Sequence, residues 1–509
     1  MNYFLNENIF TLNSGTEFSA IKRLQLFKQH GLPAKILTRN YNSNSAADIE
    51  RVDLEPSDVL NLYDYFQEAD RLPKADAALR YTDVIDKRLY HIESLDANAS
   101  LIRHHGRVIG KVRIAPATVG LVGTIDWYND NMTVTARDIW DRRGFKSSTQ
   151  YFHPDGALGP QIFFDSKGQP KIELTHMNVG GTLTATSWKL LDYQGKAWHF
   201  TTEEDFFAFF ASEMARKEAA SFICDRPSLT GALVKIEEAY GKWQYLHNTH
   251  TADHQPAGAS GELAAYLEPL FTVWRDQIDG LIVPTEQQRD EIREQYNFAQ
   301  VLALPDTYAE IVNPDLLSCP REQSIVCLGL MSAAKGSLDA VEILARVREQ
   351  LPHVRLKYYG YASPMDFQQE IEDRAKELAV EEFVEFPGYK TEAELAGILS
   401  QSGVLLNTSE GEAFGMGVLK AMSCGTPAVA YQVKYGLDEL IQNGQNGNLV
   451  PYGDVQAAAD AIVRVLSDPD LQAAYSAAAY THAQNFSADT AWLQWENARQ
   501  LVNHLFVEV

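Results

Sequence analysis

Apolar positions recur along the chain with two periods. One is typical of strands and the other of helices, and the two patterns follow each other along the sequence. Near the N-terminus, extended runs at residues 2–5 and 9–12 precede a helical pattern at 18–27 and a further strand pattern at 34–38. Toward the C-terminus, strands separated by helical segments are expected at 324–328, 355–359, 383–386, 404–407 and 428–431. Strands that alternate with helices over such a length predict mainly parallel, doubly wound α/β sheets.

Between residues 81 and 200 the pattern changes to short alternating strands. Turn sequences that contain aspartate and glycine recur there at 141–144, 153–156, 165–168 and 192–195. Aspartate and glycine favour the tight turns of β-hairpins. The segment is therefore predicted to be an antiparallel β-meander inserted into the first α/β domain. We expect most of its aromatic residues to form sheet core, with a binding face for a polypeptide or glycan as the alternative.

These patterns divide the chain into four predicted parts. Residues 1–80 and 201–320 form an N-terminal Rossmann-like domain, 81–200 the inserted meander, and 321–485 a C-terminal Rossmann-like domain. Residues 486–509 form a C-terminal helix that is apolar enough to dock on the N-terminal domain. A polar linker at 313–322 joins the two α/β domains, and a cleft between their sheets would suit a nucleotide-linked substrate.

Composition and charge exclude several classes of function. The chain has 509 residues and a formal net charge of -24, which argues against nucleic acid as a partner and against adsorption to an anionic membrane. The N-terminal residues lack a basic segment, so no signal peptide is predicted. Four scattered cysteines without metal-type spacing indicate reduced thiols. We expect a cytoplasmic protein, with at most peripheral contact at the inner face of the cell membrane.

Two loops carry the candidate chemistry. The apolar run 404–406 leads into T-S-E-G-E-A-F-G-M-G-V-L-K-A-M at 408–422, which predicts a strand, an acidic loop and a helix. Residues 13–17, N-S-G-T-E, open the first helix. A loop at the carboxyl end of a parallel strand, followed by a helix N-terminus, is where open α/β sheets bind anionic ligands.

With these motifs the chain resembles the retaining glycosyltransferases of family 4, which have the GT-B fold. Residues 13–17, the meander and His247-Asn248-Thr249-His250 make it similar to two bacterial groups in particular. One is the accessory-Sec-type protein O-GlcNAc transferase with its stabilising partner. The other is the wall teichoic acid poly(glycerol-phosphate) or poly(ribitol-phosphate) α-glycosyltransferases. The resemblance covers essentially the whole chain and implies a UDP-sugar donor and no cofactor. No aspartate-x-aspartate motif lies near the expected donor site, so we expect no metal ion.

The resemblance assigns roles to eight positions. The family has two glutamates separated by seven residues, of which the first, at the donor sugar, matches Glu412, while the second, at the ribose, falls on Lys420. Its phosphate clamp is an arginine five residues before a lysine; Lys335 matches the lysine, but Leu330 occupies the arginine position. The remaining donor-site matches are His250 near the sugar, the phosphate-loop glycine Gly15, and Phe414 and Gly415 after the acidic loop.

Each retained residue also has a purely structural interpretation. Gly15 can be a simple turn, His250 a polar loop histidine, Lys335 a solvated lysine and Glu412 a helix cap. The two replaced positions matter more. Leucine cannot supply a guanidinium fork, and an ammonium cannot accept hydrogen bonds from ribose hydroxyls, although Lys420 can reach a phosphate.

Two hypotheses of different class follow. In the first, which we favour, the chain is a non-catalytic partner that stabilises a homologous glycosyltransferase subunit and helps to present a serine- and threonine-rich polypeptide through the meander. In the second, it is an active, metal-independent transferase that moves GlcNAc or glucose from a UDP-sugar to protein or to a teichoic acid polymer. A sugar-nucleotide sensor without transfer is a remote third.

Overall fold

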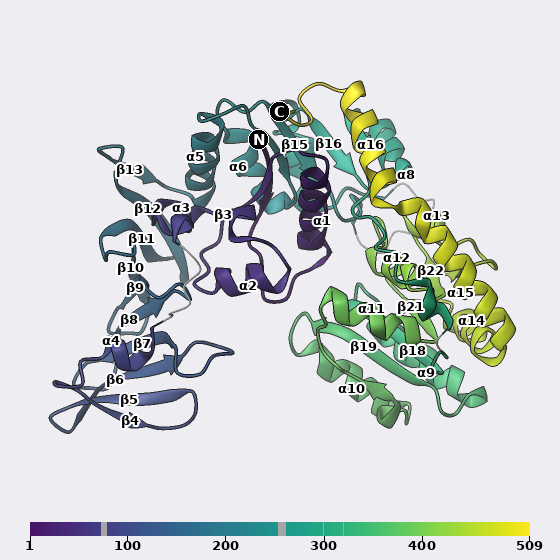
Figure 1. Cartoon of the computed structure of the whole chain (residues 1–509), viewed down its shortest axis with the longest axis horizontal. Coiled ribbons are helices and arrows are strands. Elements are labelled where there is room, and N and C mark those ends of the chain that lie inside the picture. The colour runs from purple at the N-terminus through teal and green to yellow at the C-terminus, as the bar shows by residue number, and fades with distance from the viewer. Residues whose placement is uncertain (73–78, 253–260, 299, 319, 509) are drawn as a thin grey trace. The chain divides into compact units, whose positions relative to one another are not determined.

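The computed structural model describes residues 1–72, 79–252, 261–298, 300–318 and 320–508. Contacts within the chain divide it into two compact units (Figure 1). Unit 1 comprises Met1–Thr11, Pro33–Ala220 and Gly231–Tyr240, and unit 2 comprises Leu12–Leu32, Ser221–Thr230 and Gly241–Val509. The domain boundaries expected from the sequence stay a prediction.

Unit 1 contains three parallel strands, β1 (Asn2–Asn6), β2 (Ala34–Thr38) and β3 (Val59–Asn61). All five residues of β1 are buried, as a central strand of an α/β sheet requires. The helices are α2 (Ser45–Arg51), α3 (Leu62–Phe66) and α5 (Glu203–Ala215), and α6 (Thr230–Lys235) starts at the unit boundary. The extended run expected at residues 9–12 is not a strand. It is a loop beyond the carboxyl end of β1, and the Thr11 hydroxyl in this loop donates a hydrogen bond to Asp48.

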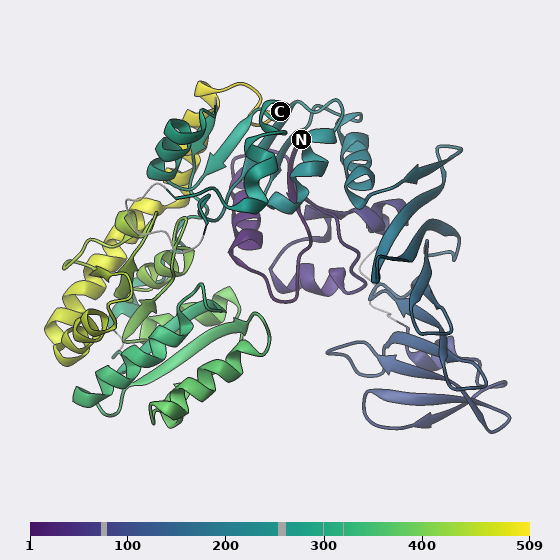
Figure 2. The same ribbon diagram turned by 180° about the vertical axis from the view of Figure 1, so that it is seen from behind.

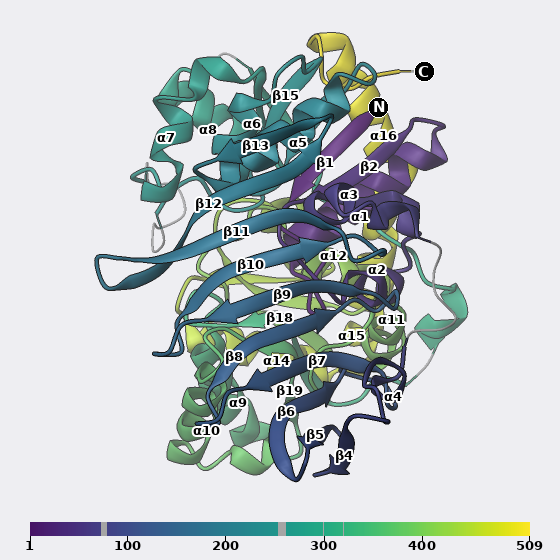
Figure 3. The same ribbon diagram turned by 90° about the vertical axis from the view of Figure 1, so that its left-hand side faces the viewer.

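The remainder of unit 1 is one ten-stranded antiparallel sheet, which confirms the predicted meander (Figure 3). Each strand pairs with the next along the chain, and glycines at 144, 156, 168 and 195 take positive φ in the predicted turns. A short helix, α4 (Tyr81–Val84), precedes the sheet. The strands are β4 (His91–Ser94), β5 (Ala99–His104), β6 (Arg107–Ile114), β7 (Val122–Tyr128), β8 (Val134–Trp140), β9 (Lys146–Phe152), β10 (Leu158–Phe164), β11 (Pro170–Val179), β12 (Thr182–Tyr193) and β13 (Lys196–Phe200).

Unit 2 begins with α1 (Gly15–Gln29) and contains two sets of parallel strands. In the first, neighbouring strands follow chain order: β14 (Ser221–Cys224), β15 (Gly241–Tyr245), β16 (Gly280–Val283) and β17 (Val301–Ala303). Helices α7 (Glu268–Phe271) and α8 (Glu286–Tyr296) accompany these strands.

The second set in unit 2 is a sheet of six strands in the order β20-β19-β18-β21-β22-β23. Five of them were expected, and β23 was not. The strands are β18 (Ser324–Met331), β19 (Arg355–Ala362), β20 (Val384–Glu385), β21 (Val404–Asn407), β22 (Ala428–Gln432) and β23 (Gly447–Pro451).

Helices cover both faces of this sheet, as the doubly wound pattern predicts (Figure 2). One group consists of α9 (Ser337–Gln350), α10 (Phe367–Glu377) and α14 (Val455–Ser467). The other consists of α11 (Glu392–Gln401), α12 (Met416–Ser423), α13 (Leu437–Leu440) and α15 (Pro469–Ala483).

The last helix, α16 (Ala488–Leu501), packs on α1 through aromatic side chains. The ring of Phe27 lies 5.7 Å from that of Trp492, 5.4 Å from that of Trp495 and 5.3 Å from that of Phe506, each edge to face. Such contacts stabilise beyond the apolar area that they bury. None of the helices in the described ranges is both long enough and apolar enough to cross a bilayer.

Candidate functional site

The acidic loop lies at the carboxyl end of β21, between that buried strand and α12, as predicted. Gly415 precedes the helix with a φ of 97°, in the left-handed region that favours glycine. A Cβ atom there would also come within 2.7 Å of Leu437. Phe414 is buried beside it. This turn fixes the direction in which α12 leaves the sheet and holds the preceding glutamate at the sheet edge.

Glu412 and Lys335, which the motifs singled out separately, bind each other. Lys335 Nζ lies 2.6 Å from Glu412 Oε1, which also accepts from Ser409 Oγ at 2.7 Å and Asn407 Nδ2 at 3.2 Å. Burial raises the pKa of the Glu412 carboxyl, but Lys335 and these donors outweigh it and hold the pKa below its ordinary value. The helix-cap interpretation is wrong, because α12 has Gly415 as its N-cap and no side-chain cap.

Leu330, at the end of β18, lines a small pocket next to this pair. The pocket has a volume of about 40 Å³ and is shared by Leu330, Lys335 and Glu412 with residues of β18, β19 and β21. An arginine at position 330 would add a cation here, whereas leucine leaves the Lys335 ammonium as the pocket's cationic group, already neutralised by Glu412.

The Lys420 ammonium contacts two carboxylates. Its Nζ lies 2.7 Å from Glu392 Oε2 and 3.3 Å from Glu310 Oε2, and Glu310 also pairs with Lys22 of α1. The Lys420 side chain is only 15% exposed. Burial lowers the pKa of Lys420, but Glu392 and Glu310 outweigh it and raise the pKa above its ordinary value. Lys420 is therefore a bound, charged lysine whose ammonium is already engaged by two acidic side chains.

His250 is fully buried in the loop that follows β15. Its Nδ1 lies 3.3 Å from the Tyr435 hydroxyl, which donates to Glu291 at 2.9 Å. Because Tyr435 donates to Glu291, its oxygen accepts from Nδ1–H, and Nε2 carries the lone pair. Burial lowers the pKa of His250 to about 4, so the ring is neutral at pH 7. Nε2 has no hydrogen-bond partner within the described part of the chain.

Backbone hydrogen bonds connect the histidine side of the site to the acidic loop. Glu412 N donates to Lys434 O at 2.8 Å, and Tyr435 N donates to Glu412 O. The Lys434 ammonium binds both oxygens of Glu291 at 2.8 Å. Sequence reasoning missed Glu291, Lys434 and Tyr435, since no motif marks residues that support a site from distant segments.

Gly15 is the first residue of α1, and a Cβ atom there would lie 3.3 Å from Met416 Sδ at the start of α12. The N-cap Ser14 forms a capping box with Glu17. Arg226, also missed from sequence, bonds Ser14 Oγ at 3.1 Å and pairs with Glu17. The structure thus brings Gly15 to the Phe414 and Gly415 turn and adds a paired arginine.

Beside this site lies a buried charged cluster around His247. His247 Nε2 is 2.8 Å from Asp225 Oδ1 and Nδ1 is 2.6 Å from Asp306 Oδ1, while Arg23 pairs with Asp225. Burial lowers the pKa of His247, but Asp306 and Asp225 outweigh it and raise the pKa to about 9. Among the described residues, no group of three or more His, Cys, Asp or Glu side chains is arranged to hold a metal ion.

Comparison with known proteins agrees with this geometry. Residues 322–468 match the family model described as Glycosyl transferases group 1. The poly(ribitol-phosphate) alpha-N-acetylglucosaminyltransferase of Staphylococcus aureus strain COL is 21% identical over 95% of this chain and 96% of its own length.

Two solved structures share the fold over nearly the whole chain. The pneumococcal O-GlcNAc transferase GtfA, in complex with UDP and GlcNAc, superposes with a TM-score of 0.83 at 20% identity, over 98% of both chains. A chain of the GtfA/B complex has a TM-score of 0.76 at 18% identity, covering 98% of this chain and 99% of its own. Residues 322–468 therefore form a glycosyl transferases group 1 domain, and the chain as a whole has the GT-B fold of these glycosyltransferases.

Proposed function

We propose that this chain is a non-catalytic partner that binds and stabilises an active, homologous glycosyltransferase in bacterial cell-surface protein O-glycosylation. The observation that carries the proposal is the arrangement around Lys420. The position that would grip the donor's ribose holds a lysine whose ammonium is bonded to Glu392 and Glu310. The Lys420 ammonium only donates, so it cannot accept the hydrogen of a ribose hydroxyl as a glutamate at this position would, and its two carboxylate partners would repel a phosphate.

Leu330 supports the same conclusion. Transfer from a UDP-sugar builds negative charge on the departing diphosphate, and loss of one stabilising group costs on the order of 3 kcal/mol, about a hundredfold in rate. At this site the arginine is replaced by Leu330, and the remaining cation, Lys335, is paired with Glu412 at 2.6 Å. The two departures affect two parts of the nucleotide, the ribose and the diphosphate.

The partner role is supported by the neighbours of the fold and by unit 1. One neighbour is a chain of a two-subunit glycosyltransferase complex. The hairpin of β11 and β12 exposes Met177, Val179 and Leu183, with 58%, 56% and 46% of each side chain accessible. Exposed apolar side chains of this kind suit a protein interface. The complex would act in the cytoplasm on a polypeptide acceptor.

The first prediction concerns turnover. Purified alone and incubated with UDP-GlcNAc or UDP-glucose and a serine- and threonine-rich peptide, the chain is expected to transfer no sugar, and UDP titration by calorimetry is expected to give no heat of binding. Mixed with its co-expressed homologue, it is expected to form a stable complex and to raise the homologue's thermal midpoint. Transfer by the chain alone would refute the proposal. The homologue alone serves as the control.

One observation favours the second candidate, an active retaining transferase acting on protein or on a teichoic acid polymer. Burial keeps His250 neutral, Tyr435 orients its ring, and its Nε2 lone pair has no partner among the described residues. A buried acceptor of this kind is suited to a sugar hydroxyl. The turnover experiment decides between the two candidates, because only the second predicts product from the chain alone.

A further inference from the structure

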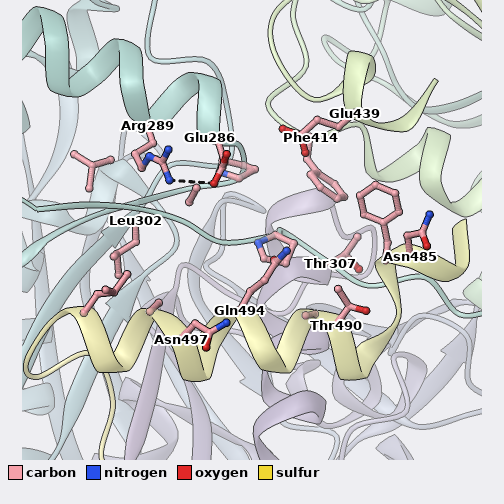
Figure 4. Close-up of a pocket in the computed structure, with 18 of the residues that line it drawn as sticks. Glu286, Arg289, Leu302, Thr307, Phe414, Glu439, Asn485, Thr490, Gln494 and Asn497 are labelled. Carbon is pink, nitrogen blue, oxygen red and sulfur yellow. Dashed lines mark hydrogen bonds and ion pairs between the residues drawn. The ribbon is translucent and has the colours of Figure 1, made fainter. Parts of the chain in front are cut away.

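A pocket of about 650 Å³ lies between α8 and α16 in unit 2 (Figure 4). Its size falls within the range of ligand sites, roughly 300–1,000 Å³. β17 contributes to its lining, and Phe414 and Phe486, with ring centroids 6.2 Å apart, close one end. The pocket is separate from the small one beside Glu412 and Lys335, although Phe414 belongs to the acidic loop.

One wall of the pocket is a sheet edge. Among the strands that the structure describes, β17 pairs only with β16. The bonds from Leu281 N to Gln300 O and from Leu304 N to Val283 O show which of its peptide groups face β16. The alternate residues, Val301 and Ala303, therefore direct their N–H and C=O groups away from β16. The carbonyl of Val301 accepts from Arg293 Nη2 at 2.6 Å. Ala303 lines the pocket, where its peptide group is placed to pair with an added strand.

The opposite wall carries amide side chains. Gln494 and Asn497 stand three residues apart on α16, and Figure 4 shows both projecting toward the pocket. Both are exposed, and neither forms a hydrogen bond with any residue that the structure describes. Side-chain amides both donate and accept, so such a pair matches the alternating N–H and C=O groups of a peptide backbone.

The charged residues that line the pocket indicate which charge a bound ligand would carry. Partial burial and the nearby Glu286 raise the pKa of the Glu439 carboxyl. Arg289 is already bonded to Glu286 at 3.2 Å and to Asp290 at 2.8 Å. Arg293 donates to the Val301 carbonyl, and the Glu439 carboxylate forms no ion pair with a residue that the structure describes. A basic group on an occupant would therefore pair with Glu439 and relieve its repulsion with Glu286.

We propose that this pocket binds an extended polypeptide segment that carries a lysine or arginine. The segment lies along β17, exchanges backbone hydrogen bonds with Ala303 and with the amides of Gln494 and Asn497, and places its basic side chain against Glu439. Addition of a strand to an exposed edge is a common mode of peptide recognition. The inference rests on the proposed function only in that a partner of a protein-modifying transferase has a polypeptide to hold.

The test is fluorescence anisotropy with the full chain and a fluorescein-labelled, twelve-residue peptide of serine and threonine with two lysines. The double variant Gln494→Ala/Asn497→Ala is expected to weaken binding at least tenfold, and Glu439→Gln to weaken it severalfold. The matched control is Gln500→Ala, an exposed amide of α16 outside the pocket, which is expected to bind like the unchanged chain. Replacing the lysines of the peptide with glutamates is expected to abolish binding.

Unchanged affinity in the double variant would overturn the proposal, as would equal binding of the glutamate peptide. Chitotetraose that binds in place of the peptide, with the same sensitivity to Gln494 and Asn497, would assign the pocket to a saccharide instead. These results are independent of the turnover experiment, since sugar transfer by the chain alone refutes the partner role whichever ligand the pocket holds. Melting curves of all variants exclude loss of folding as the cause.

Discussion

Replacing His247 with leucine is expected to lower the free energy of unfolding by roughly 3–5 kcal/mol, the cost of breaking a buried ion pair. His247 is 6% exposed and lies between Asp225 and Asp306, whose side chains are 0% and 4% exposed. Without the imidazolium, Asp306 loses its buried cationic partner in this cluster, whereas Asp225 keeps its ion pair with Arg23. Leucine fills a similar volume, so the loss reports charge and hydrogen bonding more than packing.

Urea unfolding at pH 7, followed by far-UV circular dichroism, measures this effect. His353→Leu is the matched control, because His353 is exposed on the loop after α9 and its replacement is expected to change the free energy of unfolding by less than about 0.5 kcal/mol. A loss below about 1 kcal/mol in the His247 variant would show that the two aspartates are neutralised by other means.

The same cluster predicts a fall in stability at alkaline pH. The pKa of His247 is about 9 in the folded chain and about 6.5 in the unfolded chain, so the proton is bound more tightly in the folded state. Its contribution, roughly 3 kcal/mol from this difference, is complete below pH 6.5 and is lost as the pH rises through 9. Thermal midpoints measured from pH 6 to pH 10 should fall in the unchanged chain and fall less in His247→Leu. Parallel curves would contradict the assignment.

The strands and turns could be predicted because they depend on local pattern. Unbroken apolar runs mark the buried strands β1, β16 and β21, and the aspartate and glycine turns mark the hairpins of the antiparallel sheet. β23 escaped prediction because Gly447-Asn448-Leu449-Val450-Pro451 begins with residues that rarely form strands. It becomes a strand only through its pairing with β22, which is a tertiary contact.

Sequence motifs marked several residues of the candidate site. They did not show which of these residues contact each other. Glu412 and Lys335 are each marked by a motif, yet their ion pair joins residues 77 positions apart. Glu310 lies 110 residues from Lys420, and Glu291 lies 144 residues from Tyr435, so neither pairing leaves a sequence signal. The sequence therefore identified which family positions had changed. The three-dimensional contacts were needed to find that Lys420 is held by carboxylates and that His250 is fixed as a neutral acceptor.

The double variant Leu330→Arg/Lys420→Glu is expected to give a measurable heat of UDP binding in a titration where the unchanged chain gives none. The arginine supplies a bidentate donor to the diphosphate beside Lys335, and the glutamate supplies the acceptor that ribose hydroxyls require. Hydrogen bonds to charged groups contribute about 1.5–3 kcal/mol each, so two of them correspond to a gain of about a hundredfold or more before any cost. The cost arises at position 420, where the new carboxylate faces Glu392 and Glu310, although Glu310 keeps Lys22.

Calorimetric titration with UDP therefore needs both single variants and Lys420→Met as controls. Lys420→Met removes the ammonium without adding an acceptor, so it is expected to lose stability and gain no affinity. Leu330→Arg alone is expected to recover part of the gain, because its guanidinium acts on the diphosphate without disturbing the carboxylates at Lys420. If the double variant remains folded and still binds no UDP, then Leu330 and Lys420 do not account for the absence of UDP binding. The small pocket beside Leu330, about 40 Å³ in volume, would then be the obstacle, and the loss of donor binding would lie in the packing of the loop at Glu412.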